Sequence, residues 1–230
     1  MRSYPRRVGL FLAFEGIDGS GKGTQAARLA ETALAHGHTV ASFSFPLYDD
    51  NPFSRAIGRY LNGDLGSLEH VHPALSALLY ACDRFHARPE LVRAIEESDL
   101  VVCDRYVASN LAHQGSQLEG AERTEFLEWL LEVEYGEFQL PKPGLVVLLD
   151  AHPALARELV ARKGARSYTM LEADILESDE AHGDASREIY LELAQRDGWH
   201  VVNAAGDDGA VRGVNEIAAD IWAAVEPRLA

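Results

Sequence analysis

The sequence predicts an α/β fold in which a five-stranded parallel sheet carries helices on both faces. Two observations support this prediction. Short runs of branched apolar residues alternate with longer stretches of helical periodicity along the 230 residues, and this alternation is typical of parallel sheets. A glycine-rich segment also joins the first apolar run to the first helical stretch, where a phosphate-binding loop would stand.

Five apolar runs are expected to be strands. The run LVVLL at residues 145–149 is apolar throughout, which indicates a strand that is buried on both faces. The carboxyl ends of such strands are where ligands bind in folds of this class. The expected strands cover residues 8–14, 39–45, 100–103, 145–149 and 200–202.

Stretches of helical periodicity separate these strands. The expected helices cover residues 23–36, 51–61, 73–98, 119–134, 153–163, 184–196 and 210–224. One long segment has weak periodicity, with basic residues at its start and acidic residues after them. We interpret it as a short lid at about residues 162–183 and not as a domain boundary, so residues 1–230 are expected to form one domain.

The composition argues against several classes of protein. A formal net charge of −15 repels nucleic-acid phosphates, so no nucleic-acid partner is expected. No apolar run approaches the roughly eighteen residues that a membrane span needs. Cys82 and Cys103 show neither a disulfide framework nor metal-ligand spacing, which suggests a reducing compartment and hence a cytoplasmic protein.

The glycine-rich segment carries the strongest functional signal, the spacing G-x-x-x-x-G-K that ends at Lys22. Glycines let several backbone N–H groups point at one oxyanion, and the helix that follows adds partial positive charge. Lys22 can then reach the β- and γ-phosphates of ATP. The strand before and the helix after disfavour the alternative, a glycine-rich turn without a ligand. The expected ATP-binding residues are Gly16, Ile17, Asp18, Gly19, Ser20, Gly21, Lys22, Gly23 and Thr24.

A second signal stands at the end of the third expected strand, where Asp104 and Arg105 follow an apolar run. A carboxylate beside a phosphate loop is placed to hold Mg²⁺ directly or through water. The planar guanidinium of Arg105 suits a phosphate group. A structural ion pair at the strand end is the alternative, and the phosphate loop in the same chain favours the functional interpretation.

Several motifs together resemble the thymidylate kinase family. Residues 14–22, FEGIDGSGK, resemble the opening of these enzymes, and residues 104–115, DRYVASNLAHQG, resemble their D-R-Y-x-x-S-x-x-A-Y-Q-G segment. The elements FPLY at 45–48 and YACDR at 80–84 are also similar, as are the segments 174–179 and 190–194. The matches occur in family order from about residue 9 to residue 203. The resemblance implies a three-layer P-loop NTPase fold and phosphorylation of dTMP to dTDP by ATP with Mg²⁺.

The resemblance also implies roles for individual residues. Lys22 would hold the ATP phosphates, Arg105 would clamp the acceptor phosphate, Tyr80 would stack on thymine and Arg84 would bond its carbonyl edge. The implied dTMP-binding residues are Asp18, Phe45, Tyr48, Tyr80, Arg84, Arg105, Ser109, Asn110 and His113. The implied catalytic residues are Lys22, Asp18, Arg105, Arg166 and Arg162, because the loop offers only Gly19 and Ser20 where some relatives carry a basic residue. A homodimer through the helix around 76–88 is expected as well.

Two departures from the family pattern affect these roles. Gly23 replaces the hydroxyl that usually touches Mg²⁺, so the metal is expected to be held mostly by phosphates and water, with help from Asp18, Asp104 or Glu177. His113 stands where the family usually has Tyr, which predicts weaker discrimination between deoxyribose and ribose. The sequence Gly-Lys-Gly-Thr-Gln also leaves another pyrimidine nucleoside-monophosphate kinase, acting on dUMP, UMP or CMP, as an alternative. A nucleotide-dependent switch and an inactive homologue are further alternatives.

Overall fold

The computed structural model describes residues 8–48, 51–66, 70–163, 180–195, 199–206 and 210–229. At its centre is a five-stranded sheet in the order β2-β3-β1-β4-β5, and every neighbouring pair of strands is parallel. The strands are β1 (Leu10–Glu15), β2 (Val40–Ser44), β3 (Leu100–Asp104), β4 (Leu145–Asp150) and β5 (Trp199–Asn203). All five expected strands are present, with ends that differ from the expected ones by at most two residues.

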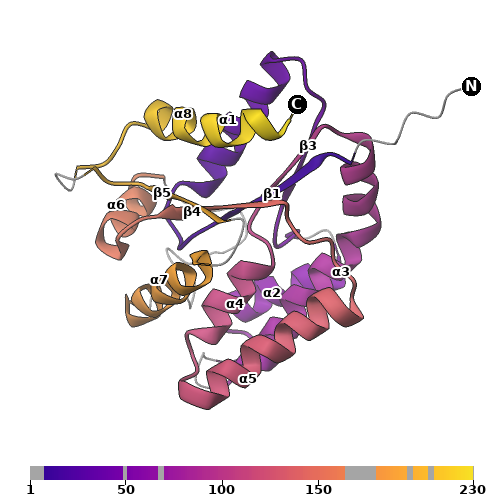
Figure 1. The fold of residues 1–230 in the computed structure, drawn as a ribbon. Helices are drawn as coiled ribbons and strands as arrows, with labels where there is room; N and C mark the ends of the chain where they lie inside the picture. The colour runs from indigo at the N-terminus through magenta and orange to yellow at the C-terminus, as the bar shows by residue number, and fades with distance from the viewer. Residues whose placement is uncertain are drawn as a thin grey trace, which may run out of the picture.

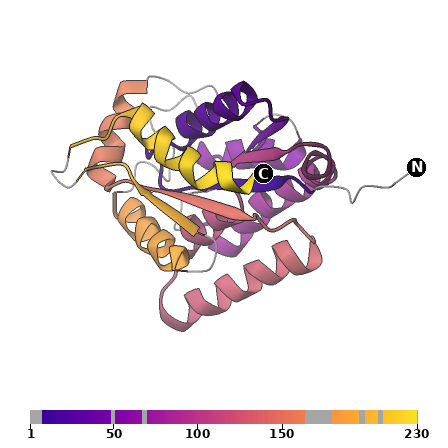
Figure 2. The same cartoon turned by 45° about the horizontal axis from the view of Figure 1, so that its top comes forward.

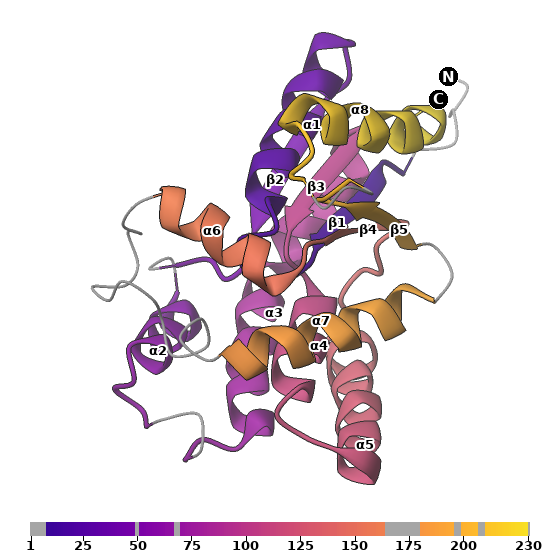
Figure 3. The same cartoon turned by 90° about the vertical axis from the view of Figure 1, so that its left-hand side faces the viewer.

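Helices cover both faces of this sheet, as Figures 1 and 2 show. Helices α1 (Lys22–Ala35) and α8 (Val214–Val225) lie on one face. Helices α3 (Pro73–Glu97), α4 (Val107–Gly115), α5 (Gly120–Leu131) and α7 (Glu180–Ala194) lie on the other. Helix α2 (Pro52–Leu61) packs on α3 away from the sheet, and α6 (Pro153–Lys163) follows β4 (Figure 3). The expected three-layer α/β fold is therefore confirmed.

Alternating side chains of the strands build two cores. In β1, Leu12 and Phe14 pack with residues of α1 and α8, whereas Phe11 and Ala13 pack with the helices of the opposite face. This alternation follows from the two-residue repeat of a strand. Both sets are buried, which explains why β1 has a nearly continuous apolar sequence, as do β3 and β4.

Some expected helix boundaries are wrong, and one helix was not expected. Residues 210–213 are not helical, since α8 begins at Val214. The expected helix 119–134 ends as an α-helix at Leu131 and continues as a π-helical turn, Glu132–Glu137. Helix α4 was missed because all nine of its residues are buried, so it has no polar face to give a helical pattern.

The carboxyl ends of β1 and β3 meet at the place where strand order reverses. The register pairs Phe14 with Asp104, so Glu15 and the phosphate loop begin beside the end of β3. Strands β3 and β4 flank β1 on opposite sides, and such a reversal leaves a crevice for ligands in open α/β sheets. Among the described residues, no helix has both the length and the apolar character needed to cross a bilayer.

Candidate active site

The phosphate loop depends on glycine at two positions. Gly16 has φ of +138°, and a Cβ there would stand 2.5 Å from the backbone oxygen of Leu149. Gly21 has φ of +96° and occupies the N-cap of α1. Side chains with a Cβ rarely adopt such φ values, so glycine is what allows the chain to turn from β1 into α1. The resulting loop ends at the positive end of a helix, which is suited to bind an anion.

Lys22 turns back over this loop. Its Nζ donates hydrogen bonds to the backbone oxygen of Ile17 at 2.7 Å and to Ser20 Oγ at 3.4 Å, and the residue is only 6% exposed. Burial, reinforced by the nearby charge of Arg105, lowers the pKa of Lys22 to about 8, against the opposing influence of Asp18, Asp104 and Glu15. The ammonium group is thus held beside the loop in a setting where an added anion would stabilise its charge.

Asp104 faces the start of α1. Its Oδ1 is buried without a hydrogen-bond partner, and its Oδ2 would stand only 2.9 Å from a Cβ at Gly23. Glycine at position 23 therefore leaves room for this carboxylate. An unsatisfied carboxylate oxygen next to a phosphate loop fits a hard cation such as Mg²⁺, which prefers oxygen ligands. Within the described part of the chain, no cluster of three or more acidic, His or Cys side chains could hold a metal without help from substrate or water.

Arg105 directly follows β3 and has a left-handed backbone conformation with φ of +67°. Its Nη2 donates to Asp18 Oδ1 at 2.6 Å, and its Nη1 lies 3.1 Å from both Ser109 Oγ and His113 Nε2. Burial alone would lower its pKa, but the charge of Asp18 contributes most to holding it well above the ordinary value. A left-handed conformation is uncommon for a residue with a side chain and persists where the surroundings fix it, often at functional sites.

His113 belongs to a chain of buried polar groups. Its Nδ1 lies 3.3 Å from His182 Nε2, and His182 Nδ1 lies 3.1 Å from Ser116 Oγ. Burial and then the charge of Arg105 lower the pKa of His113 well below its ordinary value. The ring is therefore neutral near pH 7, with Nε2 available to accept from Arg105. His113 supports Arg105 in addition to lining the cavity.

Glu15, the last residue of β1, holds the side chains and backbone next to Arg105 in place. Its carboxylate accepts from the backbone N–H of Tyr106 at 2.9 Å, from Ser109 Oγ at 2.6 Å and from Tyr190 Oη at 3.3 Å. Burial raises the pKa of Glu15, although the hydrogen bond from Ser109 opposes this effect. Because the Ser109 hydroxyl donates to Glu15, its lone pairs are left to accept from Arg105 and from Tyr190. The single hydroxyl hydrogen of Tyr190 is shared between Ser109 Oγ at 3.0 Å and Glu15.

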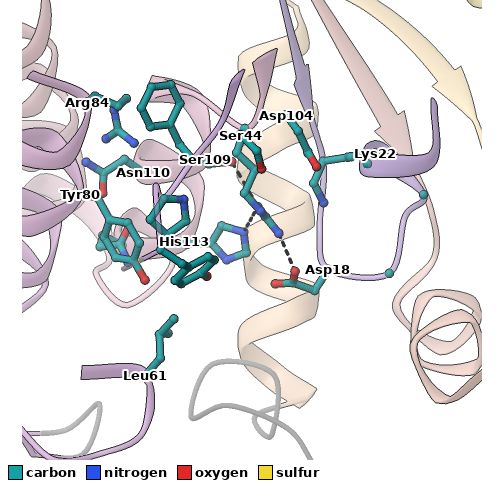
Figure 4. Close-up of a pocket in the computed structure, with 18 residues that line it drawn as sticks. Asp18, Lys22, Ser44, Leu61, Tyr80, Arg84, Asp104, Ser109, Asn110 and His113 are labelled. Carbon is teal, nitrogen blue, oxygen red and sulfur yellow. Dashed lines mark hydrogen bonds and ion pairs between the residues drawn. The ribbon is translucent and has the colours of Figure 1, made fainter. Parts of the chain in front are cut away.

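A cavity of about 290 Å³ runs from this phosphate end to a second group of side chains, shown in Figure 4. Lys22, Asp104 and Asp18 lie at one end, and Tyr80 and Arg84 lie at the other. All residues expected to bind dTMP line this cavity, namely Asp18, Phe45, Tyr48, Tyr80, Arg84, Arg105, Ser109, Asn110 and His113. Asp83, next to Arg84, fixes the segment after Phe45 by accepting from Leu47 N–H at 2.9 Å and Asn51 Nδ2 at 2.6 Å.

Arg84 and Asn110 are both held by Glu134, which lies in the π-helical turn. Arg84 donates through Nε and Nη2 to the two oxygens of Glu134, each at 2.6 Å. Asn110 Nδ2 donates to Glu134 Oε1 at 2.8 Å and to the backbone oxygen of Ala77 at 3.0 Å. Burial alone would lower the pKa of Arg84, but the charge of Glu134 holds it above the ordinary value.

The other expected site residues fall into two groups. Of the phosphate loop, Asp18, Gly19, Gly21, Lys22 and Gly23 line the cavity, whereas Gly16, Ile17, Ser20 and Thr24 are not among its lining residues. Arg166 and Glu177 lie outside the described residues, as does most of the expected lid. The backbone of Arg162 belongs to α6, but its side chain is not described. Their expected roles stay predictions.

Sequence reasoning assigned no role to Glu15, Glu134 or His182, which hold the lining side chains in place. It also missed Gln114, which lines the cavity and has a buried Nε2 with no hydrogen-bond partner. An acidic residue at the end of an apolar strand is a signal that could have marked Glu15. Glu134 and His182 come near the site only through tertiary packing, so local sequence holds no comparable signal for them.

The fold and the phosphate loop together define a P-loop NTPase-like protein. A family model described as thymidylate kinase matches residues 14–212. The thymidylate kinase of Leifsonia xyli subsp. xyli is 36% identical over 228 residues, which are 97% of each chain. That of Mycobacterium tuberculosis strain H37Rv is 32% identical over 203 residues, 87% of this chain and 94% of the relative. The chain belongs to the thymidylate kinase family and is therefore a phosphotransferase.

A solved structure agrees with this fold. The thymidylate kinase from Candida albicans superposes with a TM-score of 0.75 at 20% sequence identity. The match covers 97% of this chain and 94% of the other. At this level of identity the likeness shows the three-layer fold, and the site residues rest on the geometry described above.

Proposed function

We propose that this protein transfers the γ-phosphoryl group of ATP to dTMP, forming dTDP and ADP. The observation that carries the proposal is a single cavity with a phosphate loop at one end and a donor–acceptor pair suited to a base at the other. Arg105 lies between these two ends, where the phosphate of a bound monophosphate would be. The family to which the chain belongs supports the same activity.

The residues at the phosphate end supply charge and position. Phosphoryl transfer needs little covalent help from the protein, and catalysis comes mainly from alignment and neutralisation of charge. Lys22 would follow the phosphoryl group as negative charge spreads over its oxygens. Arg105 would hold the acceptor phosphate through its guanidinium fork, with Ser109 and His113 fixing the orientation of that fork.

The phosphate end would also hold Mg²⁺, which would supply positive charge against the negative charge that develops on the phosphates. Asp104 is the described residue whose unsatisfied oxygen fits this ion best. Asp18 already accepts from Arg105, so its share in metal binding depends on how that ion pair rearranges. Phosphate and water oxygens would complete the coordination, as Mg²⁺ sites in nucleotide enzymes usually require.

The base end favours thymine or uracil over cytosine. Arg84 keeps one nitrogen, Nη1, that donates to no described residue, and Asn110 Oδ1 is a buried acceptor without a partner. A pyrimidine with a 4-oxo group and N3–H presents an acceptor beside a donor, which complements this pair. Cytosine presents the opposite order. Tyr80 supplies an aromatic face on which the base can stack.

The test is a panel of acceptors. ATP and Mg²⁺ are offered with dTMP, dUMP, UMP, CMP and AMP, and ADP release is followed. We expect the highest kcat/KM for dTMP, lower values for the two uracil nucleotides and the lowest values for CMP and AMP. A clear preference for CMP or UMP would replace dTMP with another pyrimidine acceptor.

We also propose that residues 1–230 act as one kinase domain that forms a homodimer through α3. Leu75 and Phe85 on this helix are 61% and 44% exposed, which is high for large apolar side chains. An isologous contact between two copies of α3 would cover both. Light scattering tests this expectation, with Phe85→Glu expected to yield a monomer. A monomeric parent protein would contradict it.

A further inference from the structure

The carboxylate of Glu134 joins the two side chains that face the base end of the cavity. It lies in the π-helical turn Glu132–Glu137 and is fully buried. Arg84 comes from α3 and Asn110 from α4, so a third segment of the chain connects them. Short π-helical turns often occur at functional sites, since they change the direction in which side chains point.

The hydrogen bonds of Glu134 determine which atoms remain for a ligand. Both hydrogens of Asn110 Nδ2 are used, one by Glu134 and one by the backbone oxygen of Ala77. Its Oδ1 is then left as a buried acceptor with no partner. Arg84 uses Nε and Nη2 on the same carboxylate, which leaves Nη1 as a donor. The carboxylate of Glu134 fixes Arg84, and together with the backbone oxygen of Ala77 it fixes the orientation of Asn110, so the order of acceptor and donor is set.

We propose that Glu134 is a positioning residue that determines selectivity between 4-oxo and 4-amino pyrimidines. A carboxylate can only accept, so Glu134, together with the backbone oxygen of Ala77, requires Asn110 to turn its Nδ2 toward them and its Oδ1 toward the ligand. With that order, N3–H and O4 of a 4-oxo base are both satisfied. A 4-amino base would set its amino group against Arg84 and its N3 lone pair against Asn110 Oδ1. The inference rests on the proposed function for the assumption that a pyrimidine nucleotide occupies this end.

The isosteric change Glu134→Gln tests this role, because an amide can donate as well as accept. With Gln at position 134, only the backbone oxygen of Ala77 still holds Asn110 Nδ2 away from the cavity. Asn110 can then turn over more readily, accept through Oδ1 from the new amide and present Nδ2 to the cavity. That orientation matches the N3 lone pair of cytosine and opposes the N3–H of thymine. Arg84 remains a donor, so selectivity should decrease without reversing. A side chain that only supported the fold would weaken both ligands alike.

The experiment measures dissociation constants of dTMP and dCMP by calorimetry, without ATP. We expect Glu134→Gln to lower the preference for dTMP over dCMP by about tenfold, through weaker dTMP binding. A matched control is Asp150→Asn, which alters another bidentate carboxylate–guanidinium pair, with Arg187 at 2.6 and 2.8 Å, away from the base. It should leave the preference unchanged.

An unchanged preference in a folded Glu134→Gln variant would overturn the inference. If that variant does not fold, Glu134→Asp keeps the charge opposite Arg84, but its shorter side chain cannot reach Arg84 and Asn110 together. A smaller decrease in preference is then expected, and no decrease would overturn the inference. The proposed function is judged separately, by ADP release from the parent protein. A parent protein that binds dCMP more tightly than dTMP would refute the assigned order of donor and acceptor.

Discussion

The lowered pKa of Lys22 predicts that nucleotide binding weakens above pH 8. In the free protein, burial and Arg105 lower the pKa of this ammonium group from an ordinary value of 10.5 to about 8. A lysine with a pKa of about 8 is roughly three-quarters protonated at pH 7.5 and roughly one-tenth protonated at pH 9. Phosphates bind the charged form, so they raise the pKa of Lys22 and draw a proton from solution.

The size of the effect follows from these fractions. If the ammonium form alone binds, the dissociation constant of a triphosphate increases by about eightfold from pH 7.5 to pH 9. With an unperturbed pKa of 10.5, the same change in pH would increase it by only about 3%. The two cases are therefore easily separated by experiment.

The assay is calorimetry with a non-hydrolysable ATP analogue, without Mg²⁺, in buffers of different ionisation enthalpy. Proton uptake should accompany binding near pH 8 and be much smaller at pH 7. Lys22→Met serves as the control, because it removes the titrating group and leaves any titration of the ligand itself. Equal pH dependence in the parent and Lys22→Met would refute the reasoning, as would a constant affinity in the parent protein.

Three further predictions concern other residues of the site. Arg105→Lys should increase the KM for dTMP and leave ATP affinity nearly unchanged, because lysine keeps the charge but loses the fork; weaker ATP binding with unaltered dTMP binding would contradict this role. Gly23→Ala puts a Cβ 2.9 Å from Asp104 Oδ2 and should raise the Mg²⁺ concentration needed for half-maximal activity, whereas an unchanged requirement would exclude Asp104 as a metal ligand. Arg84→Met leaves the Glu134 carboxylate buried without its cation and should lower the free energy of unfolding, measured in urea, by about 3–5 kcal/mol. A loss below about 1 kcal/mol, as for an exposed ion pair, would contradict this expectation.

The sequence was sufficient for the parts of the fold and site that depend on local pattern. Apolar runs predicted all five strands, although only β1, β3 and β4 are buried on both faces and the edge strands β2 and β5 are not. The glycine spacing before Lys22 predicted the loop from β1 to α1. The nine residues that the family resemblance implied for dTMP binding all line one cavity. These features share a property: each residue stands in a motif a few positions long, or in a strand whose burial fixes its composition.

The features that the sequence did not reveal depend on tertiary packing. Helix α4 lacks a polar face because it is buried on every side, so its periodicity is hidden. Glu134 looks like one more acidic residue in an acidic helix, and only the π-helical turn brings it between Arg84 and Asn110. Residues of this kind support the site because they lie close to it in the folded protein. Their positions along the chain do not reveal that proximity.

The charges of the site explain how a protein with a net charge of −15 can bind two phosphorylated ligands. Each described cation of the cavity faces an acid: Arg84 pairs with Glu134, Arg105 pairs with Asp18, and Lys22 is stabilised by Asp18 and Asp104. The Arg84 pair is buried and uses two nitrogens, which suits a neutral base that needs one fixed donor. The Asp18 carboxylate, in contrast, is 35% exposed. The ion pair between Asp18 and Arg105 can therefore break when a phosphate binds Arg105, with a small loss of free energy, because water can solvate the released carboxylate.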